Sequence, residues 1–212
     1  MSYQPLCRRQ RARTGTTNSA ALAVAAAAAF AVAPAYAQAQ QGERMVRGVF
    51  GAGLTAGGDK LATVQWSNGD STNIKAGGLV DLRAGVDVKL GDTPFAVQAG
   101  IGWFVHRAGG SNGSVTFERF PIELLGTWRA AEQWRFGAGL RRAGNAKLKG
   151  RGVASNIGTT SYDANTGVVV EGEWLFATRY GVALRYVSEE YTAPNGTKAD
   201  GSHVGVRFNV YF

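Results

Sequence analysis

The sequence predicts an all-β chain, an eight-stranded antiparallel up-and-down transmembrane β-barrel that follows a cleaved signal peptide. Three observations carry this prediction. The first 37 residues have the charge and hydropathy pattern of an export signal, eight later stretches alternate apolar and polar residues, and the connections between them are alternately short and long. We therefore expect a signal peptide at residues 1–37 and a barrel domain at residues 38–212.

The amino-terminal segment is basic first and apolar afterwards. Four arginines within residues 8–13 precede an apolar run over residues 20–33, and residues 35–37 form a small-x-small cleavage site. The alternative is a transmembrane anchor, which needs roughly 20 apolar residues, more than this run provides. Cleavage is expected after Ala37, with Ala39 as the second choice, and export is expected through the general secretion route.

Removal of the signal changes what the composition implies. The chain has 23 Lys+Arg against 15 Asp+Glu, but four of these arginines belong to the signal, so the remaining surplus is ordinary and gives no reason to expect a nucleic-acid partner. The single cysteine, Cys7, also lies in the signal. Disulfides, cysteine metal sites and cysteine nucleophiles are therefore not expected in the barrel.

The alternating stretches are about ten residues long, the length of a tilted strand that crosses a bilayer. In the second stretch every even-numbered position from Val80 to Leu90 is apolar, whereas the odd-numbered positions include Asp81 and Arg83. Pro121, in the fourth stretch, cannot donate to a sheet, so a β-bulge near the outer rim is expected there. The predicted strands are residues 46–56, 78–90, 95–106, 119–128, 134–141, 168–176, 180–187 and 203–212.

The connections alternate in length, as the periplasmic turns and external loops of transmembrane barrels do. Asn-Gly pairs at residues 68–69, 112–113 and 195–196 favour two-residue hairpin turns, so three long connections form either extended hairpins above the membrane or flexible tips. The short connections are 91–94, 130–133 and 177–179, and the long ones are 57–77, 107–115, 143–167 and 188–201.

On nearly every predicted strand one face is apolar and the other carries charges of both signs. A soluble barrel would need the opposite arrangement, because water disfavours eight apolar outer stripes whereas paired charges can be buried. The apolar face is therefore predicted to contact lipid. Aromatic residues beside the short turns and the carboxyl terminus form the expected interfacial girdle: Phe95, Trp128, Trp134, Trp174, Phe176, Tyr180 and Phe212.

The charged face is expected to fill the lumen, because eight strands enclose little more than side-chain space. Two interpretations follow. Either the charges form a salt-bridged network that holds the wall together, or they line a narrow ion path in which the positive surplus favours anions. The predicted lumen network consists of Arg47, Asp81, Arg83, Asp87, Lys89, Arg119, Glu123, Arg135, Arg141, Glu171, Glu173, Arg185 and Arg207.

Other motifs carry less weight. The segment from Gly51 to Ala56 fits a loose nucleotide-binding fingerprint but opens no helix, and we expect inward glycines at spacing two to make room for arginine side chains. His106 and His203 are predicted inward near the external rim, where a meeting of the two would create a metal or pH-sensitive pair. The His-x-Ser pattern of lipid A deacylases is absent from the sequence. No catalytic, cofactor-binding or metal-binding residue is predicted.

The closing segment resembles the carboxyl-terminal recognition signal of outer-membrane barrels, in His203, Gly205, Phe208, Val210 and Phe212. This resemblance implies delivery to the barrel-assembly machinery with periplasmic chaperones, and the alternative is a last amphipathic strand without a signal.

The whole mature chain resembles the small outer-membrane β-barrel superfamily that includes the OmpA and OmpX transmembrane domains. Residues 77–80, 119–126 and 199–206 are similar to segments of poorly characterised proteobacterial outer-membrane proteins, which implies no particular activity. The expected function is that of a non-enzymatic, monomeric barrel of the Gram-negative outer membrane. It would have a structural or surface-interaction role, in contact with membrane lipid and lipopolysaccharide. A small-solute or ion channel is the alternative, and a lipid A-modifying enzyme is the third.

Overall fold

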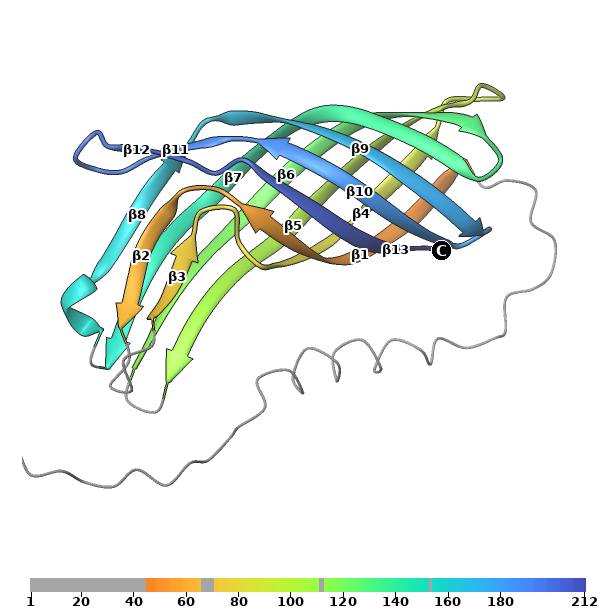
Figure 1. The fold of residues 1–212 in the computed structure, drawn as a ribbon. Helices are drawn as coiled ribbons and strands as arrows, with labels where there is room; N and C mark the ends of the chain where they lie inside the picture. The colour runs from red at the N-terminus through yellow and green to blue at the C-terminus, as the bar shows by residue number, and fades with distance from the viewer. Residues whose placement is uncertain (1–44, 66–70, 111–112, 153) are drawn as a thin grey trace, which may run out of the picture. The chain divides into compact units, whose positions relative to one another are not determined.

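The computed structural model describes residues 45–65, 71–110, 113–152 and 154–212, and the predicted signal peptide lies outside these ranges. No helix in the described ranges is long and apolar enough to cross a bilayer. The described elements (Figure 1) are β1 (Val46–Gly57), β2 (Lys60–Gln65), β3 (Ser71–Lys75), β4 (Val80–Lys89), β5 (Phe95–Gly110), β6 (Gly113–Ala131), β7 (Trp134–Gly152), the 3-10 helix η1 (Ser155–Ile157), β8 (Thr159–Ala164), β9 (Thr166–Ala177), β10 (Tyr180–Ser188), β11 (Glu190–Thr192), β12 (Lys198–Asp200) and β13 (His203–Tyr211).

Eight of these strands form a closed antiparallel ring, so the predicted barrel is confirmed. The order around the ring is β1, β4, β5, β6, β7, β9, β10 and β13, and β13 pairs with β1 to close it. At this seam Val49 lies opposite Tyr211 and Gly57 lies opposite His203. Each strand of the ring therefore has a partner on both sides, which removes the unpaired edge that a bilayer does not tolerate.

The outer surface of the ring is an apolar belt. Ile101, Ile122 and Leu184 lie on it, and each exposes more than 60% of its surface (65%, 66% and 64%). A continuous belt of this kind is unfavourable in water and matches the lipid-facing band of a transmembrane barrel. The ring thus spans a membrane with its polar face inside.

The two ends of the ring differ. The short connections β4–β5, β6–β7 and β9–β10 lie together at one end, which we name the turn end (Figure 1). At the other end, the loop end, the strands run on past the ring. Strands β6 and β7 are 19 residues each, well beyond the predicted bounds 119–128 and 134–141, and the hairpins β2–β3 and β11–β12 are also built there. The long connections are therefore largely hairpins.

Extended hairpins were one of the two predicted alternatives for the long connections, but the extra length of β6 and β7 was not predicted, because the polarity of the wall reverses there. Val115 and Phe117 of β6 and Leu148 of β7 face inward and are buried, whereas Glu118 and Lys149 lie on the outer face. This part of the wall has the apolar-in, polar-out pattern of a soluble barrel. The predicted strands were recognised by their apolar outer face, so they ended where the outer face becomes polar.

A β-bulge marks the change between the two parts. The β6–β7 register shifts between Glu118 and Phe120, and Asn145 of β7 has a φ of 53°. The bulge predicted at Pro121 therefore lies in the neighbouring strand. Pro121 itself pairs with Ala143, and its ring lies over Gly102 of β5, where a Cβ would come within 2.9 Å of the proline Cγ.

Candidate functional site: the charged lumen and its loop-end plug

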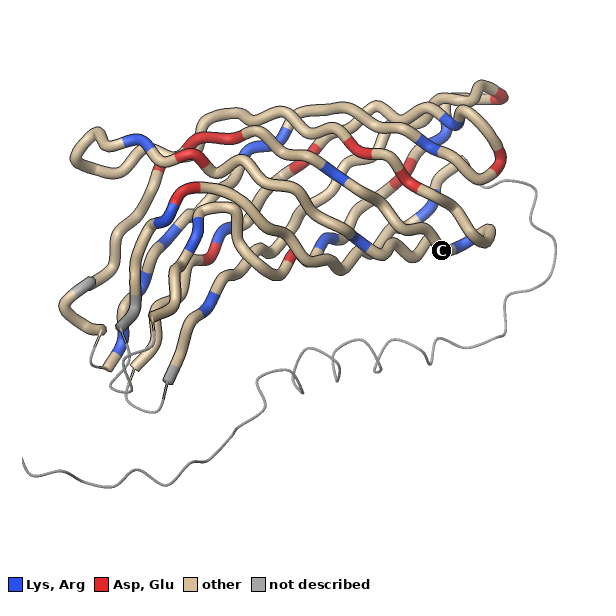
Figure 2. The backbone as a smooth tube through the Cα atoms, in the orientation of Figure 1, with Lys and Arg blue, Asp and Glu red and all other residues tan. Residues whose placement is uncertain are grey.

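The interior of the ring holds a charge-balanced set of buried side chains. Charged residues occur along most of the strands (Figure 2), and those that point inward are almost all buried. Six buried arginines face six buried carboxylates among the described residues, so the expected positive surplus does not exist in the buried lumen. The arginines are Arg83, Arg119, Arg135, Arg141, Arg185 and Arg207, and the acids are Asp81, Asp87, Glu123, Glu171, Glu173 and Glu189.

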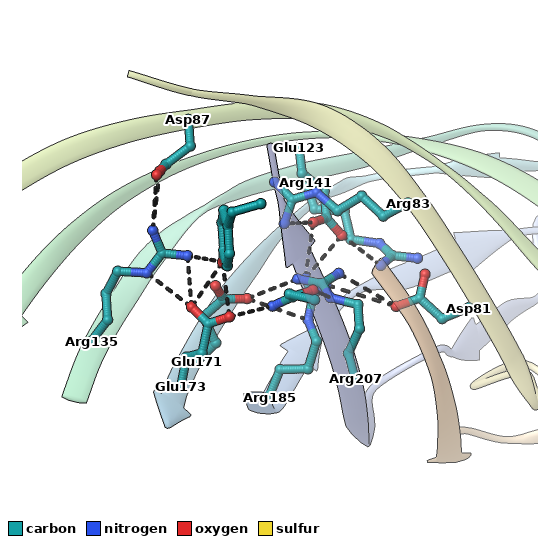
Figure 3. Close-up of polar contacts among 12 residues, drawn as sticks. Asp81, Arg83, Asp87, Glu123, Arg135, Arg141, Glu171, Glu173, Arg185 and Arg207 are labelled. Atoms are coloured by element: carbon teal, nitrogen blue, oxygen red, sulfur yellow. Dashed lines mark hydrogen bonds and ion pairs between the residues drawn. The ribbon is translucent and has the colours of Figure 1, made fainter. Parts of the chain in front are cut away.

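Glu123 of β6 is the centre of the network (Figure 3). Its carboxylate accepts hydrogen bonds from Arg141 at 2.8 Å and from Arg185 at 2.9 Å, and Arg83 lies 3.3 Å away. These three arginines come from β7, β10 and β4, so one buried carboxylate ties together four strands spread around the ring. A buried carboxylate needs such partners, because burial alone strongly disfavours its charged form.

A second group lies nearer the turn end, around Glu173 of β9. Arg135 donates to Glu173 at 2.6 Å and to Asp87 of β4 at 3.1 Å. The hydroxyl of Tyr211 and the amide of Asn209, both on β13, also donate to Glu173, at 2.8 and 2.7 Å. The closing strand is thus fixed from inside by a carboxylate two strands away.

Arg207 of β13 connects the two groups. Its guanidinium donates to Glu171 at 3.1 Å and lies 3.5 Å from Asp81 (Figure 3). Arg185 lies 3.8 Å from each of the same two carboxylates. In the lumen the arginines therefore share their acids, and the network is continuous from β4 to β13.

Inward glycines make room for some of these side chains, as expected. A Cβ on Gly51 would come within 2.8 Å of the Arg207 Cδ, and one on Gly100 within 2.7 Å of the Arg83 Nε. At Gly53 and Gly139 an added Cβ would instead meet backbone atoms of the paired strand, so glycine is needed there because two backbones approach closely. Only part of the glycine pattern is therefore explained by arginine.

At the loop end a hairpin and the segment after it pack on the end of the lumen. The β2–β3 hairpin and the segment after it contribute Ile74 and Ala76, which are fully buried, whereas Lys60, Ser71 and Asn73 of the hairpin stay exposed. A guanidinium nitrogen of Arg119 donates to the carbonyl of Ala76, and the Thr55 hydroxyl donates to the carbonyl of Gly77 at 3.0 Å. We use the name plug for residues 60–65 and 71–77 together.

The plug belongs to a separate apolar core above the charged lumen. This core joins the hairpin to β5, β6, β7, β8 and β11: Ile74, Ala76, Ala108, Val115, Phe117, Ala143, Ala146, Leu148, Ala154, Ala164 and Tyr191. Two titratable groups beside this core have shifted pKa values: hydrogen bonds from Ser202 lower the pKa of Asp200, and burial raises the pKa of Tyr162. The lumen is therefore covered by packed apolar side chains at its loop end.

The two histidines have different partners. His203 is buried, its Nδ1 lies 2.7 Å from the carbonyl of Gly201 and 3.7 Å from Glu189, and its ring packs against Phe104 at 5.1 Å. His106 instead accepts a hydrogen bond at its Nδ1 from the backbone of Lys75, at 3.2 Å. Among the described residues no group of three or more His, Cys, Asp or Glu side chains is placed to hold a metal ion.

The structure brings eleven of the thirteen predicted lumen residues into the buried network. Arg47 is 23% exposed at the turn end, where it binds Asp87 at 2.5 Å, and Lys89 is half-buried there. Sequence reasoning missed Glu189, which binds Arg119 at 2.9 Å and Arg141 at 3.1 Å. The sequence does contain an indication of Glu189, because this residue continues the odd-numbered inward positions of β10 two residues past Val187, where the predicted strand ends.

The residues predicted as the girdle all lie on the outer face near the turn end: Phe95, Trp128, Trp134, Trp174, Phe176, Tyr180 and Phe212. Phe136 and Phe208 extend the group. Phe136 stacks on Trp134 with ring centroids 6.5 Å apart, and Phe208 stacks on Tyr180 at 5.9 Å.

The residues predicted as the assembly signal divide between the two faces of β13. His203 and Gly205 face the lumen, whereas Phe208 and Phe212 are exposed on the outer face, and Val210 on that face is half-buried. Their role in assembly remains a prediction.

No family model and no curated protein matches the sequence. Solved structures do match. Neisserial surface protein A (NspA) is 12% identical, with 80% of this chain and 98% of NspA covered and a TM-score of 0.47. Ail of Yersinia pestis, solved with the heparin analogue sucrose octasulfate, is 10% identical, with 77% and 97% covered and a TM-score of 0.43. The outer membrane channel DcaP of Acinetobacter baumannii is 13% identical, with a TM-score of 0.34, and the match covers 68% of this chain but 42% of DcaP.

Three features of the structure show that the ring crosses a membrane. A closed antiparallel ring satisfies every backbone group without water, an apolar belt with an aromatic girdle surrounds it, and the charged side chains are inside. This chain folds as a small transmembrane β-barrel.

Proposed function

We propose that this protein is a non-enzymatic, non-conducting barrel that holds a folded loop-end structure at the cell surface for interaction with lipopolysaccharide, a host or a neighbouring cell. The observation that carries the proposal is the filled lumen. Arg119, Arg141 and Arg207 are among the largest fully buried side chains of the molecule, and the plug packs above them.

The loop end supports the surface role. Its hairpins share a core of their own, which an unstructured loop tip would not need. A cavity of about 630 Å³ opens there between β2, β8 and the β11–β12 hairpin, with Lys60, Tyr162, Asn195 and Lys198 in its lining.

The described hydrogen bonds of the two histidines do not form a nucleophile–base pair with a hydroxyl or thiol. A nucleophile–base pair needs a hydroxyl or thiol within hydrogen-bond reach of the base. The Nδ1 atom of His203 lies against a carbonyl oxygen, and the Nδ1 atom of His106 accepts from a backbone amide. Lipid A mass spectrometry on a deletion strain tests the non-enzymatic role, and a change in acylation or headgroup that the gene restores would overturn it.

One observation favours the channel alternative. Some guanidinium nitrogens of Arg83, Arg119, Arg141, Arg185 and Arg207 are buried and form no hydrogen bond of normal geometry in the protein, although several lie within ion-pair distance of a carboxylate. Water molecules among them would satisfy these donors, and a continuous file of water would form an ion path.

Single-channel recording of purified protein in planar bilayers decides between the two. We expect no stepwise conductance from the intact chain. Reproducible steps with anion selectivity would overturn the proposal and establish the channel.

A further inference from the structure

Basic side chains gather on the outer face of the wall, at and above the loop-end edge of the apolar belt. Figure 2 shows several Lys and Arg segments on the strands that extend at the loop end. Those on β5 and β7 that share a strand face with the lipid-facing residues are Arg107, Arg142, Lys147, Lys149 and Arg151, and we name them the basic wall. They alternate with buried residues such as Ala108, Ala143, Ala146 and Leu148, so they point away from the lumen.

The strand pairing places these side chains close to one another. Thr116 of β6 pairs with Arg107 on one side and Lys149 on the other, so the two basic residues lie about 10 Å apart, two strand spacings, on one row. Lys147 pairs with Glu118. Glu118 also forms an ion pair with Lys149, and Asp163 of the adjoining strand β8 is exposed on the same face, so the five basic residues have two acidic neighbours there. Positive charge therefore remains in excess.

The basic wall overlaps the loop-end edge of the apolar belt. Ile122 of β6 pairs with Ile101 on one side and with Arg142 on the other. Arg142 thus lies inside the apolar belt, one row below the exposed Phe120 and Trp103, and its long stem can follow this surface while the guanidinium reaches the interface. Lys147 and Lys149 follow it at higher rows. A lipid whose chains lie on Ile101 and Ile122 would present its headgroup to these cations.

We propose that the basic wall binds the phosphate groups of a phosphorylated glycolipid of the outer leaflet, of the lipid A type. Guanidinium groups bind phosphate oxygens in a bidentate manner, and ammonium groups add point charges. Basic clusters at the membrane interface select anionic lipid headgroups in the same way. The inference rests on the proposed function only in that the barrel must span the membrane, and it holds equally for a conducting or a closed lumen.

The test compares two variants that lose the same charge. The first carries Arg107→Gln, Arg142→Gln and Lys147→Gln in the basic wall. The second carries Lys75→Gln, Arg129→Gln and Arg179→Gln, which lie outside the basic wall and outside the loop-end cavity. Each folded barrel, checked by its heat-modifiable gel shift, is titrated with bis-phosphorylated and with dephosphorylated lipid A in lipid nanodiscs, and binding is measured by native mass spectrometry.

We expect the wall variant to bind bis-phosphorylated lipid A at least tenfold more weakly than the unaltered protein, since each interfacial charge contributes about fivefold in affinity. The matched control should change less than twofold. Dephosphorylated lipid A should bind the unaltered protein weakly, and millimolar inorganic phosphate should not compete.

Three results would overturn the proposal. Equal losses in the two variants would indicate a general charge effect. Equal affinity for the two lipids would assign binding to the acyl chains. Undiminished lipid binding by the wall variant, together with lost binding of polyglutamate, would make the wall a docking surface for an acidic protein. Bilayer conductance is measured separately, so none of these results depends on whether the lumen conducts.

Discussion

The Phe212 ring lies over the α-carbon of Gly48, where the barrel closes. A Cβ on residue 48 would overlap the ring, and the two backbones exchange hydrogen bonds of 2.8 Å (Gly48 N to Phe212 O) and 3.0 Å (Phe212 N to Gly48 O). The last residue of the chain therefore completes the pairing of β13 with β1 through its backbone and covers the seam with its side chain.

Gly48→Ala should destabilise the folded barrel by about 1–3 kcal/mol, because the new methyl group displaces the Phe212 ring. Urea unfolding in lipid vesicles measures this free energy. Gly126→Ala is the matched control on the same outer face, since its nearest neighbour, the carbonyl oxygen of Ala138, would be 3.9 Å from the added Cβ. Equal effects of the two changes would mean that the ring does not constrain residue 48.

Deleting Phe212 should affect assembly in cells more than folding in vitro. Trimming one exposed aromatic side chain forfeits at most about 1.5–3 kcal/mol of burial, whereas recognition by the assembly machinery precedes any burial. We expect sharply reduced outer-membrane levels and unfolded protein in the periplasm, while protein refolded from urea still shows the gel shift. Phe212→Ala, which keeps the backbone at the seam, separates the two causes. Normal assembly of both variants would make the segment an ordinary strand.

Leu184→Arg should cost roughly 2–4 kcal/mol, because this side chain is 64% exposed in the middle of the lipid-facing belt. Ser188→Arg lies on the same face of β10, four residues nearer the loop end, where the cost falls to about 0–1 kcal/mol. Folded yield in vesicles of defined thickness reports both. If the two variants fold equally well, the belt does not face lipid at Leu184.

Glu123→Gln should destabilise the barrel by about 3–5 kcal/mol, since it removes the charge that Arg83, Arg141 and Arg185 share while they stay buried. Arg47→Gln is the comparison and should cost about 1 kcal/mol or less, because Arg47 is partly exposed and Asp87 keeps its contact with Arg135. Urea midpoints measure both. A loss below 1 kcal/mol for Glu123→Gln would show that the network does not hold the wall together.

The loop end should face the outside of the cell. The chain has one cysteine, Cys7 in the predicted signal, so a single introduced cysteine can report its own position. A membrane-impermeant maleimide added to intact cells should label Asn195→Cys in the β11–β12 hairpin. It should label Asp92→Cys in the β4–β5 turn only after the outer membrane is permeabilised. The reverse pattern would invert the topology.

The sequence alone determined the architecture of the ring. Alternation at every second residue fixes which face of each strand meets lipid, so the apolar belt, the girdle positions and the inward direction of residues such as Arg141 and Glu171 followed without coordinates. Eight such stretches with alternating connections leave a closed up-and-down barrel as the arrangement with no exposed strand edge.

Only the tertiary structure decided which inward residues meet. Alternation gives the direction of a side chain but not the register of the strands, so the sharing of Glu123 by three arginines and the separate partners of His106 and His203 could not be predicted. The charge balance of the lumen also depended on Glu189, which belongs to a strand end that periodicity did not reach. At the loop end the sequence left extended hairpins as one of two alternatives, but it did not give the inward residues of the extended strands, because polarity reverses where the wall leaves the lipid and a β-bulge at Asn145 changes which residues of β7 point inward. At the loop end the outer face of the wall contacts water instead of lipid, so the same apolar–polar alternation places the apolar residues inside.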